Sequence, residues 1–138
     1  MLAVDASVLL AIEDRDDPNH ASSRSLLEGG EPLATLDLAA YEVVSVAVRR
    51  WGDPATTERL RSRVFELSTD GLLIRATPTL LAEAEQVALE YGITAYDAAY
   101  VAAARQLGAP LASCDVRDLV SRGLASLPGD LLTEDRLR

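Results

Sequence analysis

Residue types that carry metal or nucleophile chemistry are scarce in this chain of 138 residues. Its one cysteine, Cys114, excludes an internal disulfide framework and fits a reducing compartment. Its one histidine, His20, leaves no zinc cluster, and the Gly-x-Ser-x-Gly elbow of serine hydrolases is absent. The glycine-rich loops of nucleotide-binding proteins are missing as well. The sequence therefore argues against a disulfide-stabilised protein, a zinc protein, a serine hydrolase and a nucleotide-binding protein with a glycine-rich loop.

Lysine is absent too, and all 13 basic residues are arginines, against 22 acidic residues. The net charge of -9 argues against general binding to a nucleic-acid backbone, which favours basic surfaces. A locally basic stretch is the exception; it comprises Arg49, Arg50, Arg59, Arg61 and Arg63. An acidic surface also suits an arginine-rich protein partner.

Long uncharged apolar runs are missing, so no membrane-spanning helix is predicted. The first residues include Asp5 and no basic stretch, which predicts that there is no signal peptide and that the protein is cytoplasmic. Apolar residues make up 49% of the chain and aromatic residues only 4%, so the core should consist mainly of Ala, Leu and Val. Length and composition predict one domain, residues 1–138.

Short apolar segments alternate with helical patterns along the chain. Strands are predicted at 2–4, 32–34, 72–75 and 110–113, with a last one at 124–127. Helices are predicted at 7–12, 19–28, 37–48, 54–67, 78–91, 94–108 and 116–122. This alternation predicts an α/β fold with a mostly parallel central sheet, whose ligands bind outside the carboxyl ends of the strands.

Four acidic residues stand where a carboxylate is costly unless something positive binds it. Asp5 follows the apolar run 1–4, and Asp115 closes the predicted strand at 110–113. Asp97 heads a run of small residues. Glu42 is the only charge in 38–48, within an apolar helix that should be mostly buried. Carboxylate oxygens suit Mg²⁺ or Mn²⁺, so the hypothesis is one shared metal pocket. Ser7 and Ser113, each two residues from an acid, can orient a carboxylate or a metal-bound water.

Each acid also has a purely structural interpretation. Asp5 and Asp115 can cap the helices that follow them. Asp97 lies three residues after Thr94, which is the spacing of a capping box. Glu42 can reach solvent or pair with an arginine such as Arg105.

The chain resembles the PIN-domain family and, within it, the VapC toxins of prokaryotic toxin–antitoxin pairs. The resemblance rests on the segment 4–9, on Glu42 in its apolar helix, and above all on the block 96–115. It implies a single PIN-like domain in which helices flank a mostly parallel central sheet. It also implies an Mg²⁺ site, with Mn²⁺ as a substitute, formed by Asp5, Glu42, Asp97 and Asp115. Asp118 is an alternative to Asp115 as the fourth acid.

The resemblance further implies an Mg²⁺-dependent endoribonuclease that leaves a 5′-phosphate and a 3′-hydroxyl. Its partners would be RNA, a cognate VapB-like antitoxin that blocks the pocket with a basic segment, and a second copy in a homodimer. With no lysine to hold phosphate, Arg49 and Arg50 are predicted to guide the RNA.

Three other functions stay open at this point. The first is a PIN nuclease of RNA processing outside a toxin–antitoxin pair, and the second is a catalytically silent interaction module. The third is a signalling receiver-like module, which also has an acidic magnesium pocket. That family's pattern has paired acids after the first strand and a lysine near the site, whereas Asp5 stands alone and lysine is absent.

Overall fold

The computed structural model describes residues 1–132 of the chain; residues 133–138, with which the predicted domain ends, lie outside the described part. The elements, in chain order, are β1 (Leu2–Val4), α1 (Ala6–Glu13), α2 (His20–Glu28), β2 (Leu33–Leu36), α3 (Leu38–Arg50), α4 (Pro54–Asp70), β3 (Leu72–Ile74), α5 (Pro78–Tyr91), α6 (Ala95–Leu107), β4 (Leu111–Ala112), a π-helical turn (Val116–Val120) and a 3-10 turn (Pro128–Leu131).

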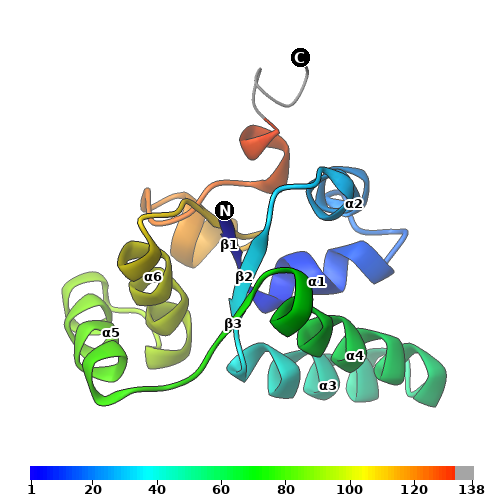
Figure 1. The fold of residues 1–138 in the computed structure, drawn as a ribbon, viewed down its shortest axis with the longest axis horizontal. Helices are drawn as coiled ribbons and strands as arrows, with labels where there is room; N and C mark the ends of the chain where they lie inside the picture. Colours follow the sequence, from blue (N-terminus) through cyan, green and yellow to red (C-terminus); the bar gives the residue numbers. More distant parts are fainter. Residues whose placement is uncertain (133–138) are drawn as a thin grey trace.

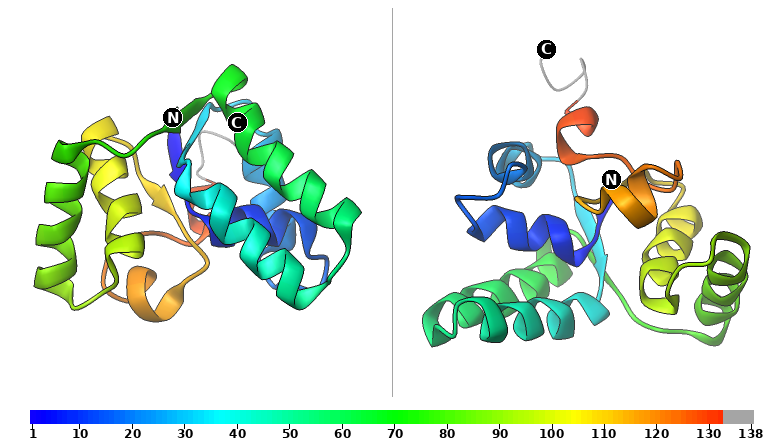
Figure 2. Two further views of the ribbon diagram at one scale, coloured as in Figure 1. Left: turned by 90° about the horizontal axis from the view of Figure 1, so that it is seen from below. Right: turned by 180° about the vertical axis from the view of Figure 1, so that it is seen from behind.

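The strands form one parallel sheet in the order β3-β2-β1-β4, which confirms the predicted fold class. Helices α1 to α4 lie on one side of the sheet, and α5 and α6 lie on the other (Figures 1 and 2). The helices that connect β1, β2 and β3 therefore cover one face of the sheet, and the helices that connect β3 to β4 cover the other. The covered face changes between β1 and its neighbour β4. In sheets of this kind, ligands bind at the carboxyl ends of the strands where this change occurs.

Helix α6 packs against the sheet with an uninterrupted run of buried residues, 98–104. Five of these seven residues are alanines, so the helix backbone can approach both the sheet and α5 closely. Thr94 caps the helix, because its hydroxyl accepts a hydrogen bond from the backbone N–H of Asp97 at 3.1 Å. Gly108 ends the helix in the left-handed conformation, at φ 62°. The predicted core of Ala, Leu and Val is present in the structure.

The predicted strand at 124–127 is wrong. Only an isolated bridge forms there, between Ala112 and Ser126. The pairing stops after one residue because the 3-10 turn begins at Pro128, two residues later.

The expectation that the helix around Glu42 is mostly buried is also wrong. Only Ala39, Val43 and Ala47 of α3 are buried, and they recur every four residues on one face. On the other faces, the Tyr41 side chain is 79% exposed and the Val48 side chain is 58% exposed. Apolar residues of a helix can lie in the core or on a surface that binds a partner. The sequence alone does not distinguish these two positions.

Within residues 1–132, no helix combines the length and the apolar character needed to span a bilayer.

Candidate functional site

Two of the predicted acids lie at the carboxyl ends of adjacent strands. Asp5 directly follows β1, and its backbone N–H donates to the carbonyl of Ala112 in β4 at 3.3 Å. Asp115 follows β4 by three residues. Both residues also cap the helical segments that follow them, so the structural interpretation is correct without excluding a metal role.

The Asp5 carboxylate is only 5% exposed and is held by hydroxyl donors on both oxygens. Its Oδ1 accepts from the Ser7 hydroxyl at 2.5 Å and from the Ser7 N–H at 3.0 Å. Its Oδ2 accepts from the Ser113 hydroxyl at 2.5 Å. Burial raises the pKa of Asp5 to about 6, and the hydrogen bonds from the two serines act in the opposite direction. Asp5 is therefore fixed in place, but its burial makes the ionised form of the carboxylate less favourable.

The two serines join the ends of β1 and β4. The Ser113 side chain is fully buried, and its hydroxyl accepts from the Asp115 N–H at 3.0 Å while it donates to Asp5. The Ser7 hydroxyl accepts from the Cys114 N–H at 2.8 Å. Both serines thus contact a candidate metal ligand, as their positions in the sequence suggested. Burial also raises the pKa of the Cys114 thiol, to about 11, so this cysteine stays protonated at neutral pH.

Glu42 lies half-buried on α3 and is paired with a tyrosine of α6. The Tyr100 hydroxyl donates to Glu42 Oε1 at 2.6 Å. Within residues 1–132, Glu42 forms no ion pair with Arg105 or with any other arginine. Burial, followed by the charge of Glu42, raises the pKa of Tyr100 far above its usual range.

Tyr100 was missed by the sequence reasoning, although a signal was present. It follows Asp97 by three residues on one helix, so both side chains lie on the same face of α6. A tyrosine hydroxyl on the face that carries a candidate ligand is well placed to donate to a second carboxylate.

The other three acids form a separate group. One carboxylate oxygen from each of Asp97, Asp115 and Asp118 lies within 4.8 Å of the others, and all three residues are half-buried. Burial raises the pKa of Asp97, and the charges of Asp115, Glu42 and Asp118 raise it further. Asp97 thus links this group electrostatically to Glu42. The two alternatives for the fourth acid, Asp115 and Asp118, lie side by side.

A wide helical turn brings Asp118 to this position. The predicted helix at 116–122 is a π-helical turn, in which the N–H of Val120 bonds to the carbonyl of Asp115 at 3.0 Å. Asp115 Oδ1 accepts from the N–H of Asp118 at 3.0 Å, which holds the two residues together. The donors of the whole site are carboxylate oxygens, and this set fits Mg²⁺ or Mn²⁺ rather than a softer metal.

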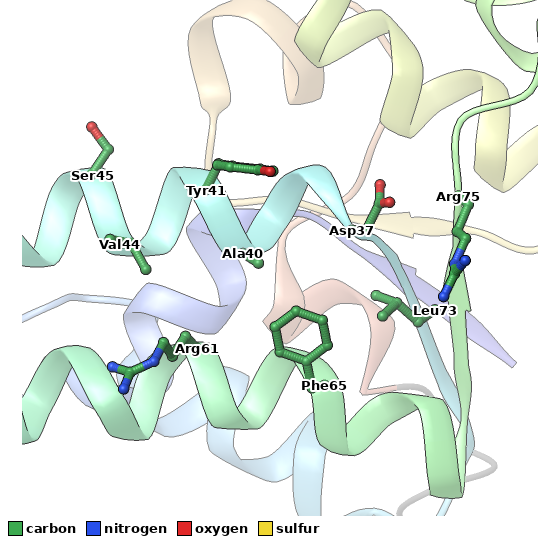
Figure 3. Close-up of a pocket in the computed structure, with 9 residues that line it drawn as sticks. All are labelled: Asp37, Ala40, Tyr41, Val44, Ser45, Arg61, Phe65, Leu73 and Arg75. Atoms are coloured by element: carbon green, nitrogen blue, oxygen red, sulfur yellow. The ribbon is translucent and has the colours of Figure 1, made fainter.

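An apolar groove lies between α3 and α4, apart from the candidate acids (Figure 3). Its volume is about 610 Å³. The lining residues are Asp37, Ala40, Tyr41, Val44, Ser45, Arg61, Phe65, Leu73 and Arg75. None of the five candidate acids is among them, so the chemistry suggested by the acids does not depend on this groove.

The two arginines predicted to guide RNA lie at the carboxyl end of α3, about two turns beyond Glu42. Arg50 pairs with Asp14 at 3.2 Å, and its guanidinium lies 5.3 Å from the centre of the Trp51 ring. Arg49 is exposed and donates to the carbonyl of its own helix at Ser45. A role in guiding RNA stays a prediction for both residues.

Comparison with known proteins identifies related chains. The family model described as PIN domain matches residues 2–121. The chain is 33% identical, over 117 residues, to Ribonuclease VapC3 of Pyrobaculum aerophilum, covering 83% of this chain and 88% of that protein. The structure of PAE2754 from Pyrobaculum aerophilum is 28% identical, with a TM-score of 0.67, and covers 95% of this chain and 85% of that one. A chain from a toxin–antitoxin complex of Klebsiella pneumoniae is 16% identical, with a TM-score of 0.69, and covers 93% of this chain and 98% of that one.

Proposed function

Because the chain belongs to the PIN-domain family, we propose that it is a divalent-metal-dependent endoribonuclease of the VapC toxin type. The observation that carries the proposal is the acidic site at the carboxyl ends of β1 and β4. It contains a group of three carboxylates within 4.8 Å of one another, with a fourth acid, Glu42, coupled to it by charge. A relative at 33% identity that is named a ribonuclease supports RNA as the substrate.

In the proposed reaction, Asp97, Asp115 and Asp118 hold Mg²⁺, with Mn²⁺ as a substitute. Glu42 would contribute a further ligand oxygen, and the buried Asp5 would add its negative charge close by. The bound ion would supply a more acidic water molecule and polarise the phosphoryl group of an RNA phosphodiester. Ser7 and Ser113 keep Asp5 in position, and the products would be a 5′-phosphate and a 3′-hydroxyl.

The proposed regulatory partner is a cognate VapB-like antitoxin that places a basic segment in the acidic pocket. The net charge of -9 supports this pairing. Both molecules would act in the cytoplasm, where the RNA substrate is found.

We also propose that the chain forms a homodimer. Three large side chains of α3, α5 and α6 are more than half exposed; they are Tyr41, Leu81 and Tyr96. All three are among the residues that line one apolar pocket of about 270 Å³. An exposed apolar surface of this kind is a frequent feature of interaction sites.

Expression in a bacterial host tests the proposed activity even though the RNA target is unidentified. We expect induction of the wild-type chain to arrest growth and to create new 5′-phosphate ends in cellular RNA. Asp97→Asn should abolish both effects, whereas Glu85→Gln, which removes an exposed acid of α5, should abolish neither. Identical RNA ends in folded wild type and Asp97→Asn would contradict the proposal and favour a catalytically silent module.

Co-expression tests the toxin assignment separately from the nuclease activity. If the product of a small neighbouring gene restores growth, the toxin–antitoxin assignment is supported. RNA cleavage that no such gene product suppresses would favour RNA processing outside a toxin–antitoxin pair.

A further inference from the structure

The pairing of Tyr100 with Glu42 joins two helices at the acidic site and was not predicted from the sequence. The hydrogen bond is 2.6 Å long and joins α6 to α3 across 58 residues of sequence. Tyr100 is only 3% exposed, and the hydroxyl of a buried tyrosine usually has a hydrogen-bond partner within the protein.

The nature of this partner distinguishes the contact from ordinary core packing. A buried hydroxyl can be satisfied by any backbone carbonyl, as the Thr35 hydroxyl is by the carbonyl of Val4 at 2.7 Å. Tyr100 instead donates to a carboxylate that approaches Asp5 and Asp97 closely enough for the charges to interact. A phenol is protonated at neutral pH, so the Tyr100 hydroxyl can donate to this carboxylate at every pH near neutrality.

Glu42 needs such a restraint more than the other acids do. Asp5 and Asp115 are held through backbone N–H groups that their short side chains cap. Glu42 has a longer side chain and is only half-buried, so repulsion by the other acids would drive its carboxylate towards solvent. Within residues 1–132, the bond from Tyr100 is the only hydrogen bond to its carboxylate, so Oε2 is left for an ion.

We propose that Tyr100 is a positioning residue whose hydroxyl holds Glu42 in the orientation in which Glu42 binds the divalent ion. This inference rests on the proposed metal-dependent function and adds a residue to its machinery. Tyr100 itself does not touch the ion.

Calorimetric titration with Mn²⁺ tests the inference on the full chain. We expect Tyr100→Phe, which removes only the hydroxyl, to weaken Mn²⁺ binding by about 10- to 100-fold, as for other residues that support a metal ligand. Glu42→Gln should weaken binding at least as much. In the double variant, Tyr100→Phe should cost nothing beyond Glu42→Gln, because its whole effect passes through Glu42. Tyr91→Phe, at the end of α5, is the matched control: it also removes only a tyrosine hydroxyl, and it should bind like wild type.

A second variant keeps the test decisive if Tyr100→Phe does not fold. Glu42→Asp keeps the charge but shortens the side chain beyond the reach of Tyr100, and it lies at a half-buried position. It should weaken Mn²⁺ binding as Tyr100→Phe does. Unfolding temperatures measured in EDTA identify the variants that are folded.

The outcomes separate the inference from the proposed function. If the wild type binds Mn²⁺ and Glu42→Gln weakens binding while folded Tyr100→Phe does not, the inference alone is overturned. Additive losses in the double variant, or wild-type affinity in Glu42→Asp, would overturn it as well. A wild type that binds no Mn²⁺ would overturn both the inference and the metal-dependent function.

Discussion

The acidic site contains two groups of carboxylates that are held in different ways. The inner pair, Asp5 and Glu42, is fixed by side-chain hydroxyls from three other residues. The outer cluster, Asp97, Asp115 and Asp118, is half-buried. Burial raises the pKa of Asp97, and repulsion by the other two members raises it further. The inner pair therefore keeps its geometry without an ion. The outer cluster is where a divalent ion should relieve the most repulsion.

The largest expected effect on metal binding comes from removing the central charge of the outer cluster. Asp97→Asn removes a charge that Asp115, Asp118 and Glu42 repel, so the unfolding temperature in EDTA should rise. In the wild type, Mn²⁺ at 100 times its Kd should stabilise the fold by about 2.7 kcal/mol. In Asp97→Asn, with affinity at least about 100-fold weaker, this gain should fall to about 0.4 kcal/mol or less, which differential scanning fluorimetry with and without Mn²⁺ can measure. A full Mn²⁺-induced gain in Asp97→Asn would show that the outer cluster is not the ion site.

The inner pair should make the metal-free protein sensitive to pH. Asp5 has a pKa of about 6 in the folded state, against its ordinary value of 3.8, which applies to the unfolded chain. Between these values the folded protein holds a proton that the unfolded chain has released. The free energy of unfolding should therefore fall as the pH rises through this window, by as much as about 3 kcal/mol. Urea unfolding in EDTA at pH 4 to 7 measures the slope.

Asp5→Asn is the matched variant for the pH experiment. It should remove most of this slope, because the amide does not titrate. The half-buried Asp97 contributes in the same direction and should account for part of what remains. An unchanged slope in Asp5→Asn would mean that burial does not raise the pKa of Asp5.

The two serines of the inner pair should differ in their importance for stability. Ser113→Ala removes a fully buried hydroxyl that serves both Asp5 and the Asp115 N–H, so it should cost about 1–3 kcal/mol. Ser7→Ala should cost less, because the Ser7 backbone N–H still donates to Asp5. Urea unfolding at pH 7 compares the two variants. A larger loss for Ser7→Ala would reverse this ranking.

The smallest effect is expected outside both groups. Arg50, whose side chain is half exposed, pairs with Asp14 at 3.2 Å on the protein surface, so Arg50→Ala should cost only about 0.2–1 kcal/mol. Its Mn²⁺ affinity should equal that of the wild type. If Arg50 guides RNA, Arg50→Ala should weaken RNA cleavage but not Mn²⁺ binding. A lower Mn²⁺ affinity in Arg50→Ala would contradict the conclusion that the carboxyl end of α3 lies outside the acidic site.

The position of the acids could be predicted because it depends on local pattern. A short apolar segment before Asp5 and another before Asp115 predict strands, and parallel strands bring their carboxyl ends to one edge of the sheet. The family prediction, which rested on the same segments, is confirmed by the match over residues 2–121.

The division of the site into two groups could not be predicted, because it depends on packing. The bond between Tyr100 and Glu42 spans 58 residues, and only the folded chain brings the two together. The place of Asp118 beside Asp115 depends on a π-helical turn, which has no specific signal in the sequence. The exposed face of α3 was misjudged for the same reason, since its apolar residues do not reveal which of them contact the sheet.

Calorimetric titration of wild type, Asp97→Asn and Glu85→Gln with Mn²⁺ at neutral pH tests the central claim most directly. The claim is that these acids form one divalent-metal site, with Asp97 linking the outer cluster to the inner pair. It predicts binding by the wild type and by Glu85→Gln, and affinity at least about 100-fold weaker in Asp97→Asn, since supporting residues alone cost about 10- to 100-fold. A wild type that binds no metal, or a folded Asp97→Asn that binds equally well, would contradict it.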